Sequence, residues 1–208
     1  MKKLLNIFLL VLHTTFLQAY NDDNINSFNI KIDNFEYTKL GIACINNNFK
    51  EVNELISFGA NINFVKQDEY YIYDALYVTI ESNSLEVLAL LIKNINININ
   101  INQIYTEDGL TPIALAVSLN NYRIVDILLQ NKANPNGKLL STSSHQSIPL
   151  IIAFENDNIE ITKLLLKYNA NTNIKNEFGQ NLEKLFKTKG SSWHELLKDR
   201  GEYNRTNS

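Results

Sequence analysis

The sequence predicts an all-α solenoid, in which stacked helix-turn-helix units are joined by extended hairpin fingers. Three observations predict it: a short end signature recurs four times, each copy follows a helix with the same apolar spacing, and a shorter apolar block precedes each of those helices. The chain of 208 residues has a formal net charge of −3 and one cysteine, Cys44. This balance gives no reason to expect nucleic acid as a partner, and a single cysteine excludes an intramolecular disulfide.

Residues 1–19 have the features of a secretory signal peptide. Two lysines follow Met1, an apolar run extends from Leu4 to Leu12, and the small residue Ala19 ends the segment. The alternative is a membrane anchor, but the apolar run is shorter than the roughly 20 residues that a spanning helix needs. We therefore expect cleavage after Ala19 and export to the periplasm or the medium, with no stable membrane anchor after cleavage.

Residues 20–33 are expected to form an N-terminal cap segment, because Ser27–Ile32 alternates in polarity and would cover the first repeat. The end signature then recurs four times along the chain. The first, third and fourth copies share the pattern Ala-Asn-x-Asn. The four copies are Gly59–Asn63, Ile95–Asn98, Lys132–Asn136 and Asn169–Asn173.

Each signature follows a helix whose apolar positions are spaced by three, three and one residues. This spacing places the four side chains on one stripe of a helix, whereas a strand would send alternate ones to opposite faces. They are Phe49, Val52, Leu55 and Ile56; Leu85, Leu88, Leu91 and Ile92; Tyr122, Val125, Leu128 and Leu129; and Ile159, Thr162, Leu165 and Leu166, with Thr162 replacing an apolar residue. With the preceding apolar blocks, the units begin at Thr38, Asp74, Thr111 and Ile148, at steps of 36, 37 and 37 residues.

The third unit resembles an ankyrin repeat along most of its length. The resemblance rests on Asp108–Ala116, which reads Asp-Gly-Leu-Thr-Pro-Ile-Ala-Leu-Ala, and on Ile124–Leu129 and Ala133–Asn136. It extends over residues 34–182 as four repeats plus the start of a partial fifth. Another helical-pair solenoid, such as the tetratricopeptide type, lacks both the end signature and the Thr-Pro helix start. With its leader segment, the chain is similar to ankyrin-repeat proteins of a bacterial exported type.

Two departures from the family pattern bear on the fold. The usual histidine of the first helix is replaced by Gly41, Tyr77, Ala114 and Ile151, so the hydrogen bonds that this histidine makes between repeats are missing. The usual glycine between the helices is replaced by Asn47, Asn83, Asn120 and Asp157. Asparagine and aspartate tolerate a left-handed backbone better than other non-glycine residues, so we expect the turn to form.

Residues 183–208 are expected to form capping helices and a tail. Ser192–Glu195 has the pattern of a capping box, with Leu196 and Leu197 on the helix behind it. Trp193 is expected to pack onto the last repeat. A solenoid needs such end caps, because each repeat otherwise exposes an apolar face.

No residue pattern indicates catalysis. After leader removal the histidines are His145 in a finger and His194 in the C-terminal cap, which should lie far apart. A glycine-rich phosphate loop and a Gly-x-Ser-x-Gly elbow are both absent. Glu107 and Asp108 could form a carboxylate pair, but a solvated finger tip explains them better. We therefore expect no catalytic residue, no cofactor and no metal ion.

The resemblance implies a binding surface made by the finger tips and by the first-helix face of the concave groove. The finger positions are Phe35, Tyr37, Tyr70, Tyr71, Tyr73, Glu107, Asp108, Leu110, Ser144, His145 and Ser147. The helix positions are Ile45, Asn46, Glu81, Ser82, Ser118, Leu119, Glu155 and Asn156. Tyrosines suit such surfaces because they bury a large area and keep a polar tip, although some of them could instead pack inside the enlarged finger. We expect partner contacts from Tyr37, Tyr70, Tyr71, Tyr73, Glu81, Glu107, Asp108, Leu110, Leu119 and His145.

Two functions from different classes remain. The first is an exported protein-binding module that acts as a scaffold, an inhibitor or an effector on a partner protein whose identity the sequence does not reveal. The alternative is an enzyme, or an accessory to one, with a site grafted onto the fingers. Fold does not decide between them, because function resides in sites. The lack of a paired histidine, cysteine or metal-binding cluster favours the binding module.

Overall fold

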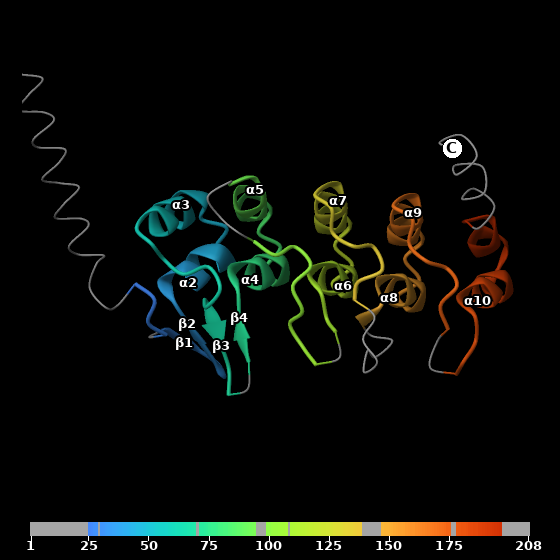
Figure 1. Cartoon of the computed structure of the whole chain (residues 1–208), viewed down its shortest axis with the longest axis horizontal. Coiled ribbons are helices and arrows are strands. Elements are labelled where there is room, and N and C mark those ends of the chain that lie inside the picture. The colour runs from blue at the N-terminus through green and yellow to red at the C-terminus, as the bar shows by residue number, and fades with distance from the viewer. Residues whose placement is uncertain are drawn as a thin grey trace, which may run out of the picture. The chain divides into compact units, whose positions relative to one another are not determined.

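The computed structural model describes residues 25–28, 30–69, 71–94, 99–107, 109–138, 147–175 and 178–196. The chain divides into two compact units, Met1–Ile97 and Asn98–Ser208, which we call unit 1 and unit 2. Each unit is built of helix pairs. Within each unit the first helix of a pair lies nearer the connecting fingers than the second helix does (Figure 1).

Unit 1 contains two helix pairs that lie side by side. The first pair is α2 (Lys39–Ile45) and α3 (Phe49–Ser57), and the second is α4 (Ala75–Glu81) and α5 (Leu85–Lys93). Helix α2 packs against α4 and helix α3 against α5, so equivalent helices share a layer. Val52, Leu55, Val87, Leu88 and Leu91 are buried, because their spacing puts them on the helix faces that meet.

A small antiparallel sheet, which the sequence did not predict, lies on the finger side of unit 1. Its strands are β1 (Ile30–Ile32), β2 (Phe35–Tyr37), β3 (Lys66–Gln67) and β4 (Ile72–Tyr73), hydrogen-bonded in that order. Strand β1 lies in the expected cap segment, and β3 and β4 form the first finger. The all-α prediction is therefore too simple: the fold is mainly helical, and the N-terminal hairpin extends the finger into a sheet.

Unit 2 also contains two helix pairs, and a further helix follows them. Its pairs are α6 (Pro112–Ser118) with α7 (Tyr122–Gln130), and α8 (Pro149–Glu155) with α9 (Ile159–Lys167). Helix α6 packs against α8 and α7 against α9. Helix α10 (Leu182–Lys189) follows, and residues 191–196 are again helical. The stacked order of these elements is visible in Figure 1.

The first helix of each pair begins where the repeat period places it. The side chains of Thr38, Asp74 and Thr111 cap α2, α4 and α6, accepting hydrogen bonds from backbone N–H groups three residues later at 3.2, 2.7 and 3.4 Å. Ile148 occupies the fourth starting position and has no side-chain acceptor. Pro149 follows it, and proline is favoured in the first turn because its fixed φ already suits a helix. The predicted helix starts are confirmed.

The turns between paired helices use a left-handed residue, as the sequence predicts. Asn47, Asn83, Asn120 and Asp157 have φ values of 51°, 57°, 54° and 55°. The side chain of Asn47 reaches the next pair, where its Oδ1 accepts from the backbone N–H of Val87 at 3.2 Å and its Nδ2 donates to Glu86. Asn120 Oδ1 likewise accepts from Asn158 Nδ2 at 3.2 Å. These residues therefore join successive repeats as well as turning the chain.

Asparagines of the end signatures form a second set of contacts between repeats. The backbone N–H groups of Asn61, Asn134 and Asn171 donate to the side-chain oxygens of Asn26, Asn102 and Asn136 at 2.7, 2.8 and 2.6 Å. In the second repeat Asn102 makes this contact, and its own backbone N–H donates to Asn100 Oδ1 at 3.1 Å, whereas the predicted signature Ile95–Asn98 falls outside the described residues. The strict alternation of isoleucine and asparagine from Ile95 to Asn102 makes neighbouring registers look alike in sequence, which explains the shift.

Gly41 shows why one of the family histidines is missing. A Cβ atom at this position would lie 2.2 Å from the carbonyl oxygen of Val65. The same oxygen accepts a hydrogen bond of 3.1 Å from the backbone N–H of Thr38. The first finger therefore passes directly over the start of α2 and leaves no space for a side chain.

The C-terminal end contains a further helix pair, α10 and residues 191–196, where the sequence predicts capping helices. Asn181 caps α10, and Gly190, nine residues later, has a φ of 136° at the turn. The predicted capping box is wrong, because the last helix already includes residues 191 and 192, so Ser192 lies inside it. The predicted packing of Trp193 is confirmed: its ring is 4% exposed and lies edge-on to Phe154 of α8 at 5.1 Å between ring centroids. Leu197 falls outside the described residues.

Candidate partner-binding surfaces

The tyrosines predicted to bind a partner divide into buried and exposed ones. Tyr37 and Tyr73 are only 6% and 8% exposed, whereas Tyr71 is 41% exposed. The rings of Tyr71 and Tyr73 lie 6.3 Å apart, as expected for alternate residues of an extended segment. Tyr70 falls outside the described residues. Tyr37 and Tyr73 thus follow the alternative that the sequence left open, which is packing within the finger. Among the described tyrosines of this group, Tyr71 is the exposed one.

The buried tyrosines surround a lysine. Lys66 lies on β3 directly between Tyr37 of β2 and Tyr73 of β4 in the sheet register. Its ammonium nitrogen is 4.0 Å from the centroid of the Phe35 ring, 5.9 Å from Tyr37, 5.2 Å from Tyr73 and 5.3 Å from Tyr77. We call these four rings the aromatic cage. Three of the rings belong to the sheet and Tyr77 belongs to α4, so the cage lies where the sheet meets the helix.

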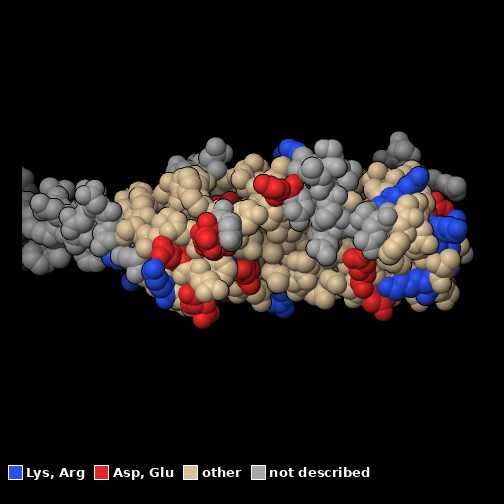
Figure 2. Space-filling model, turned by 90° about the horizontal axis from the view of Figure 1, so that it is seen from below, with Lys and Arg blue, Asp and Glu red and all other residues tan. Residues whose placement is uncertain are grey.

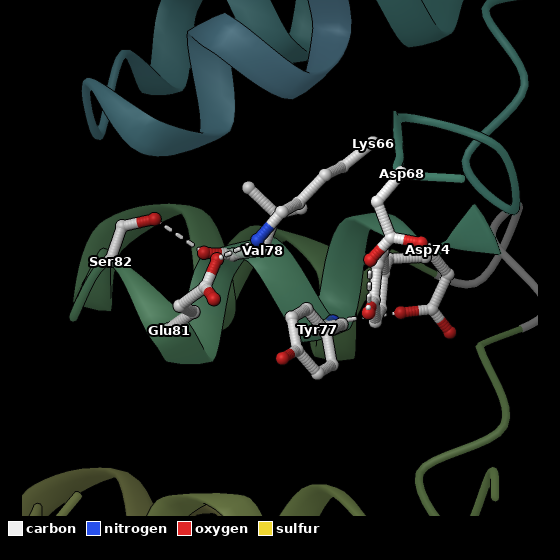
Figure 3. Close-up of polar contacts among 8 residues, drawn as sticks. Lys66, Asp68, Asp74, Tyr77, Val78, Glu81 and Ser82 are labelled. Carbon is white, nitrogen blue, oxygen red and sulfur yellow. Dashed lines mark hydrogen bonds and ion pairs between the residues drawn. The ribbon is translucent and has the colours of Figure 1, made fainter. Parts of the chain in front are cut away.

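Glu81, predicted to contact a partner, completes the surroundings of this lysine. Its Oε2 accepts a hydrogen bond of 2.6 Å from Lys66 Nζ, within an ion pair whose side chains are 3% and 39% exposed for Lys66 and Glu81. Figure 3 shows the lysine reaching across to Glu81 on α4, with Tyr77 on the same helix. Glu81 is thus engaged inside unit 1 and keeps only part of its side chain available to another molecule.

The tyrosine hydroxyls of the cage stay neutral at ordinary pH. Burial raises the pKa of Tyr77 to about 12, with a further contribution from the Glu81 carboxylate. Burial also raises the pKa of Tyr73, whose hydroxyl donates to Asp68 Oδ2 at 3.1 Å. The rings of Tyr73 and Tyr77 are tilted by 34°, and their centroids lie 4.3 Å apart. Neutral rings present their electron-rich faces to a cation, so the cage suits an ammonium group.

Unit 2 contains a groove at the positions where the family resemblance places ligands. Its volume is about 400 Å³, and it lies between a finger, the end of α6 and the first helix α8. Five lining residues are predicted finger or first-helix positions: Leu110, Ser118, Ser147, Glu155 and Asn156. Thr106 and Ile152 complete the lining. The structure therefore brings residues from three separate segments of the sequence to one surface.

The finger wall of this groove is shaped by a tight turn. The backbone N–H of Tyr105 donates to the carbonyl of Leu110 at 2.8 Å, and that of Gly109 donates to the carbonyl of Thr106 at 3.0 Å. The hydroxyl of Thr106 accepts from the N–H of Leu110 at 3.2 Å. These bonds fix Leu110 at the groove, while Glu107 at the turn is exposed. Asp108 and His145 fall outside the described residues.

The helix wall of the groove places polar side chains beside apolar surface. Ser118 uses its hydroxyl to donate to the carbonyl of Leu115 at 2.8 Å, and the neighbouring Leu119 is 46% exposed. The side chains of Glu155 and Asn156 make no hydrogen bond or ion pair with any residue that the structure describes. Viewed from the finger side, unit 2 shows acidic side chains on this face and basic ones gathered at the C-terminal helices (Figure 2).

The described ranges were also informative for metal binding, thiol chemistry and membrane spans, and each point concerns those ranges alone. They hold no group of three or more histidine, cysteine or acidic side chains placed to bind a metal ion. Cys44 is fully buried, and burial raises the pKa of its thiol to about 12, so the thiol stays protonated at neutral pH. None of the described helices combines the length and the apolar character needed to cross a membrane.

Comparison with known proteins agrees with the repeat geometry. Residues 100–176, all in unit 2, match the family model described as ankyrin repeats (3 copies). An ankyrin repeat protein of Fowlpox virus (strain NVSL) is 34% identical over 107 residues, a stretch that covers 50% of this chain and 29% of the viral protein. The matches, the capped helix starts and the asparagine contacts between successive repeats within each unit together support ankyrin repeats in this chain.

Proposed function

We propose that the chain is an exported protein-binding module that holds a partner protein in the groove of unit 2. The observation that carries the proposal is the groove itself, where finger residues and first-helix residues converge around about 400 Å³ of open space. Ankyrin repeats generally mediate contacts between proteins, and the family implies a non-catalytic binding module. The scaffold, inhibitor and effector roles all use such a contact.

The chemistry of the groove favours a partner segment that is apolar on one side and donates hydrogen bonds on the other. Leu110, Ile152 and the exposed Leu119 supply apolar contact. Glu155 and Asn156 supply a carboxylate and an amide that no described residue satisfies. A partner that buried these polar groups without pairing them would lose binding energy, so we expect it to carry a basic or amide side chain opposite Glu155.

Filling the groove should weaken partner binding without unfolding unit 2. Ser118 is exposed at the end of α6, so Ser118→Trp places a large ring in the groove. We expect at least about tenfold weaker retention of the partner, equivalent to roughly 1.4 kcal/mol. The matched control is Arg123→Trp, which adds the same ring to an exposed position on α7 of the same repeat.

The measurement uses the immobilised full chain and its two variants, exposed to envelope and medium fractions of the source cell and to a host lysate. Quantitative mass spectrometry then compares the proteins that each retains. Support requires a protein that the parent and Arg123→Trp retain equally and Ser118→Trp loses, with all three chains melting at similar temperatures. Identical retention by all three would refute the groove as the binding surface.

Export is proposed on the sequence of residues 1–19, whose basic start, apolar run and small terminal residue suit a bacterial secretory leader. We expect the mature protein, isolated from the envelope or the medium, to begin at or near Tyr20. Mass spectrometry of the intact protein and of its N-terminal peptide measures this directly. Cytoplasmic protein that keeps Met1 would contradict the proposal.

A further inference from the structure

Lys66 is a charged side chain almost completely removed from water, with an exposed fraction of 3%. Burying an ammonium ion is costly unless a counter-charge and polarisable neighbours replace the lost water. Here Glu81 supplies the counter-charge at 2.6 Å, and four aromatic rings surround the nitrogen. We propose that the aromatic cage and Glu81 form a binding site for a primary alkylammonium ion, which the chain fills with its own Lys66 and which thereby holds the finger sheet on α4.

The register of the sheet explains how the site is assembled. Tyr37 pairs with Lys66 and Lys66 pairs with Tyr73, so one row across β2, β3 and β4 reads tyrosine, lysine, tyrosine. Paired residues of neighbouring strands point to the same face with Cβ atoms about 5 Å apart. The lysine is therefore flanked by rings on both sides, and Phe35, two residues before Tyr37, lies on the same face.

The opposite face of the same strands has a different composition. There Glu36 pairs with Lys31 on one side and Gln67 on the other. Lys31 Nζ lies 2.8 Å from Glu36 Oε1, and Gln67 Nε2 donates to Glu36 Oε2 at 2.7 Å. Lys31 is 76% exposed, so its ion pair is a solvated one and contributes little. The two lysines of the sheet thus have distinct roles, and Lys31 serves as a control for Lys66.

The site adds a side-chain contact to the backbone bonds that already connect the finger to the helices, such as the one from Ala75 N–H to the carbonyl of Ile62 at 2.6 Å. Strands β3 and β4 contain two residues each, and so short a hairpin is marginally stable alone. Tyr77 and Glu81 lie one helical turn apart on α4, which places both on the side facing Lys66. The Lys66 ammonium group contacts rings of the sheet and residues of α4 at the same time. Removing it should therefore loosen the sheet from α4.

The experiment removes the Lys66 side chain by mutation and then adds a small ammonium compound that replaces the missing atoms. Lys66→Ala in the full chain removes three carbons and the ammonium nitrogen, which together correspond to n-propylammonium. We expect the backbone amides of residues 30–37 and 66–73 to exchange hydrogen at least about tenfold faster in Lys66→Ala, while residues 149–167 keep their parental rates. Hydrogen exchange followed by mass spectrometry reads both segments in one sample.

Added n-propylammonium chloride should restore the protection. At about ten times its dissociation constant, a ligand of the ordered state slows exchange from the open state by about tenfold. n-Propanol, which has the same length and no charge, and sodium chloride at the same concentration should have no such effect. Adding Phe35→Leu to Lys66→Ala removes the nearest ring and should weaken the response to propylammonium. Lys31→Ala should leave exchange in residues 66–73 unchanged.

Lys66→Met separates a cation site from simple filling of space, because methionine has a similar length and no charge. Parental protection in Lys66→Met would overturn the proposal, as would equal restoration of Lys66→Ala by propylammonium and propanol. A loosened sheet over intact α2–α5 in Lys66→Met supports it. Both variants could unfold unit 1 altogether. In that case, recovery of the Lys66→Ala fold by propylammonium but not by propanol supports the cation site, and failure of both compounds to restore the fold overturns it.

Discussion

The variant Trp193→Ala is expected to lower the free energy of unfolding of unit 2 by about 3–5 kcal/mol, the usual cost of truncating a buried tryptophan. Trp193 is 4% exposed and lies 5.1 Å, between ring centroids, from both Phe154 and Phe186. It therefore joins α8 of the preceding repeat to α10 of the last helix pair. Removing the ring detaches the pair that covers the apolar end of the stack. Urea denaturation followed by far-ultraviolet circular dichroism measures the loss.

Trp193→Phe is the matched control, because it keeps most of the ring contact and removes one polar interaction. The indole Nε1 donates to Asp157 Oδ1 at 3.2 Å, and phenylalanine has no such donor. We expect this change to cost about 1 kcal/mol, the net value of a typical hydrogen bond. Equal losses for Trp193→Ala and Trp193→Phe would show that ring packing does not stabilise this end of the molecule.

Leu128→Ala is expected to destabilise unit 2 by about 2–5 kcal/mol, because it opens a cavity in the core between α7 and its neighbours. Leu128 is fully buried, and its carbonyl accepts backbone hydrogen bonds from Asn131 at 3.1 Å and Ala133 at 3.0 Å. The side chain thus packs beneath the turn that leads into the asparagine contacts. Thermal and urea unfolding should both shift.

Leu119→Ala is the comparison within the same repeat. Leu119 is 46% exposed beside the groove, so its truncation should change the free energy of unfolding by less than about 0.5 kcal/mol. If it contacts the partner, the same variant should weaken partner retention, which Leu128→Ala should not do per folded molecule. A comparable loss of stability in the two variants would contradict the buried and exposed assignments of these leucines.

The features predicted correctly from sequence are those that depend on local chemistry. The starts of α2, α4 and α6 follow from Thr38, Asp74 and Thr111, whose side chains cap the backbone only three residues ahead. The left-handed turns follow from an intrinsic property of asparagine and aspartate. Both signals lie within a few residues of the structure that they determine.

The features that were missed depend on contacts between distant segments. The aromatic cage requires the register of β2, β3 and β4, and two-residue strands carry too little alternation to reveal it. The burial of Tyr37 and Tyr73 has the same origin, since both flank Lys66. The wrong capping box arose because Ser192 has the right local pattern, whereas the turn position is occupied by Gly190.

The candidate groove was partly predictable for a third reason. The ankyrin resemblance, carried along the repeat register, implies that Ser118, Glu155 and Asn156 are first-helix positions of the binding surface, and the structure places all three around one space. The position of a residue within the repeat indicates which way its side chain points, but it does not indicate which residues that side chain contacts. The sequence therefore could not indicate that Glu81 is engaged by Lys66 while Glu155 remains unpaired among the described residues.

The contact between Asp157 and Trp193 constrains how this protein can lengthen by gene duplication. Asn120 and Asn136 bond to Asn158 and Asn171 of the next repeat, so a copy of Thr111–Ser147 inserted before residue 148 would meet matching amides at both of its junctions. A copy added after the fourth repeat would meet Asp157, which accepts hydrogen bonds but donates none, and which Trp193 and Lys189 now satisfy. Internal copies are therefore compatible with the existing junctions. At the C-terminal end the Asp157 carboxylate could accept the hydrogen bond that Asn120 accepts, but an added repeat would first have to displace Trp193 and Lys189 from it.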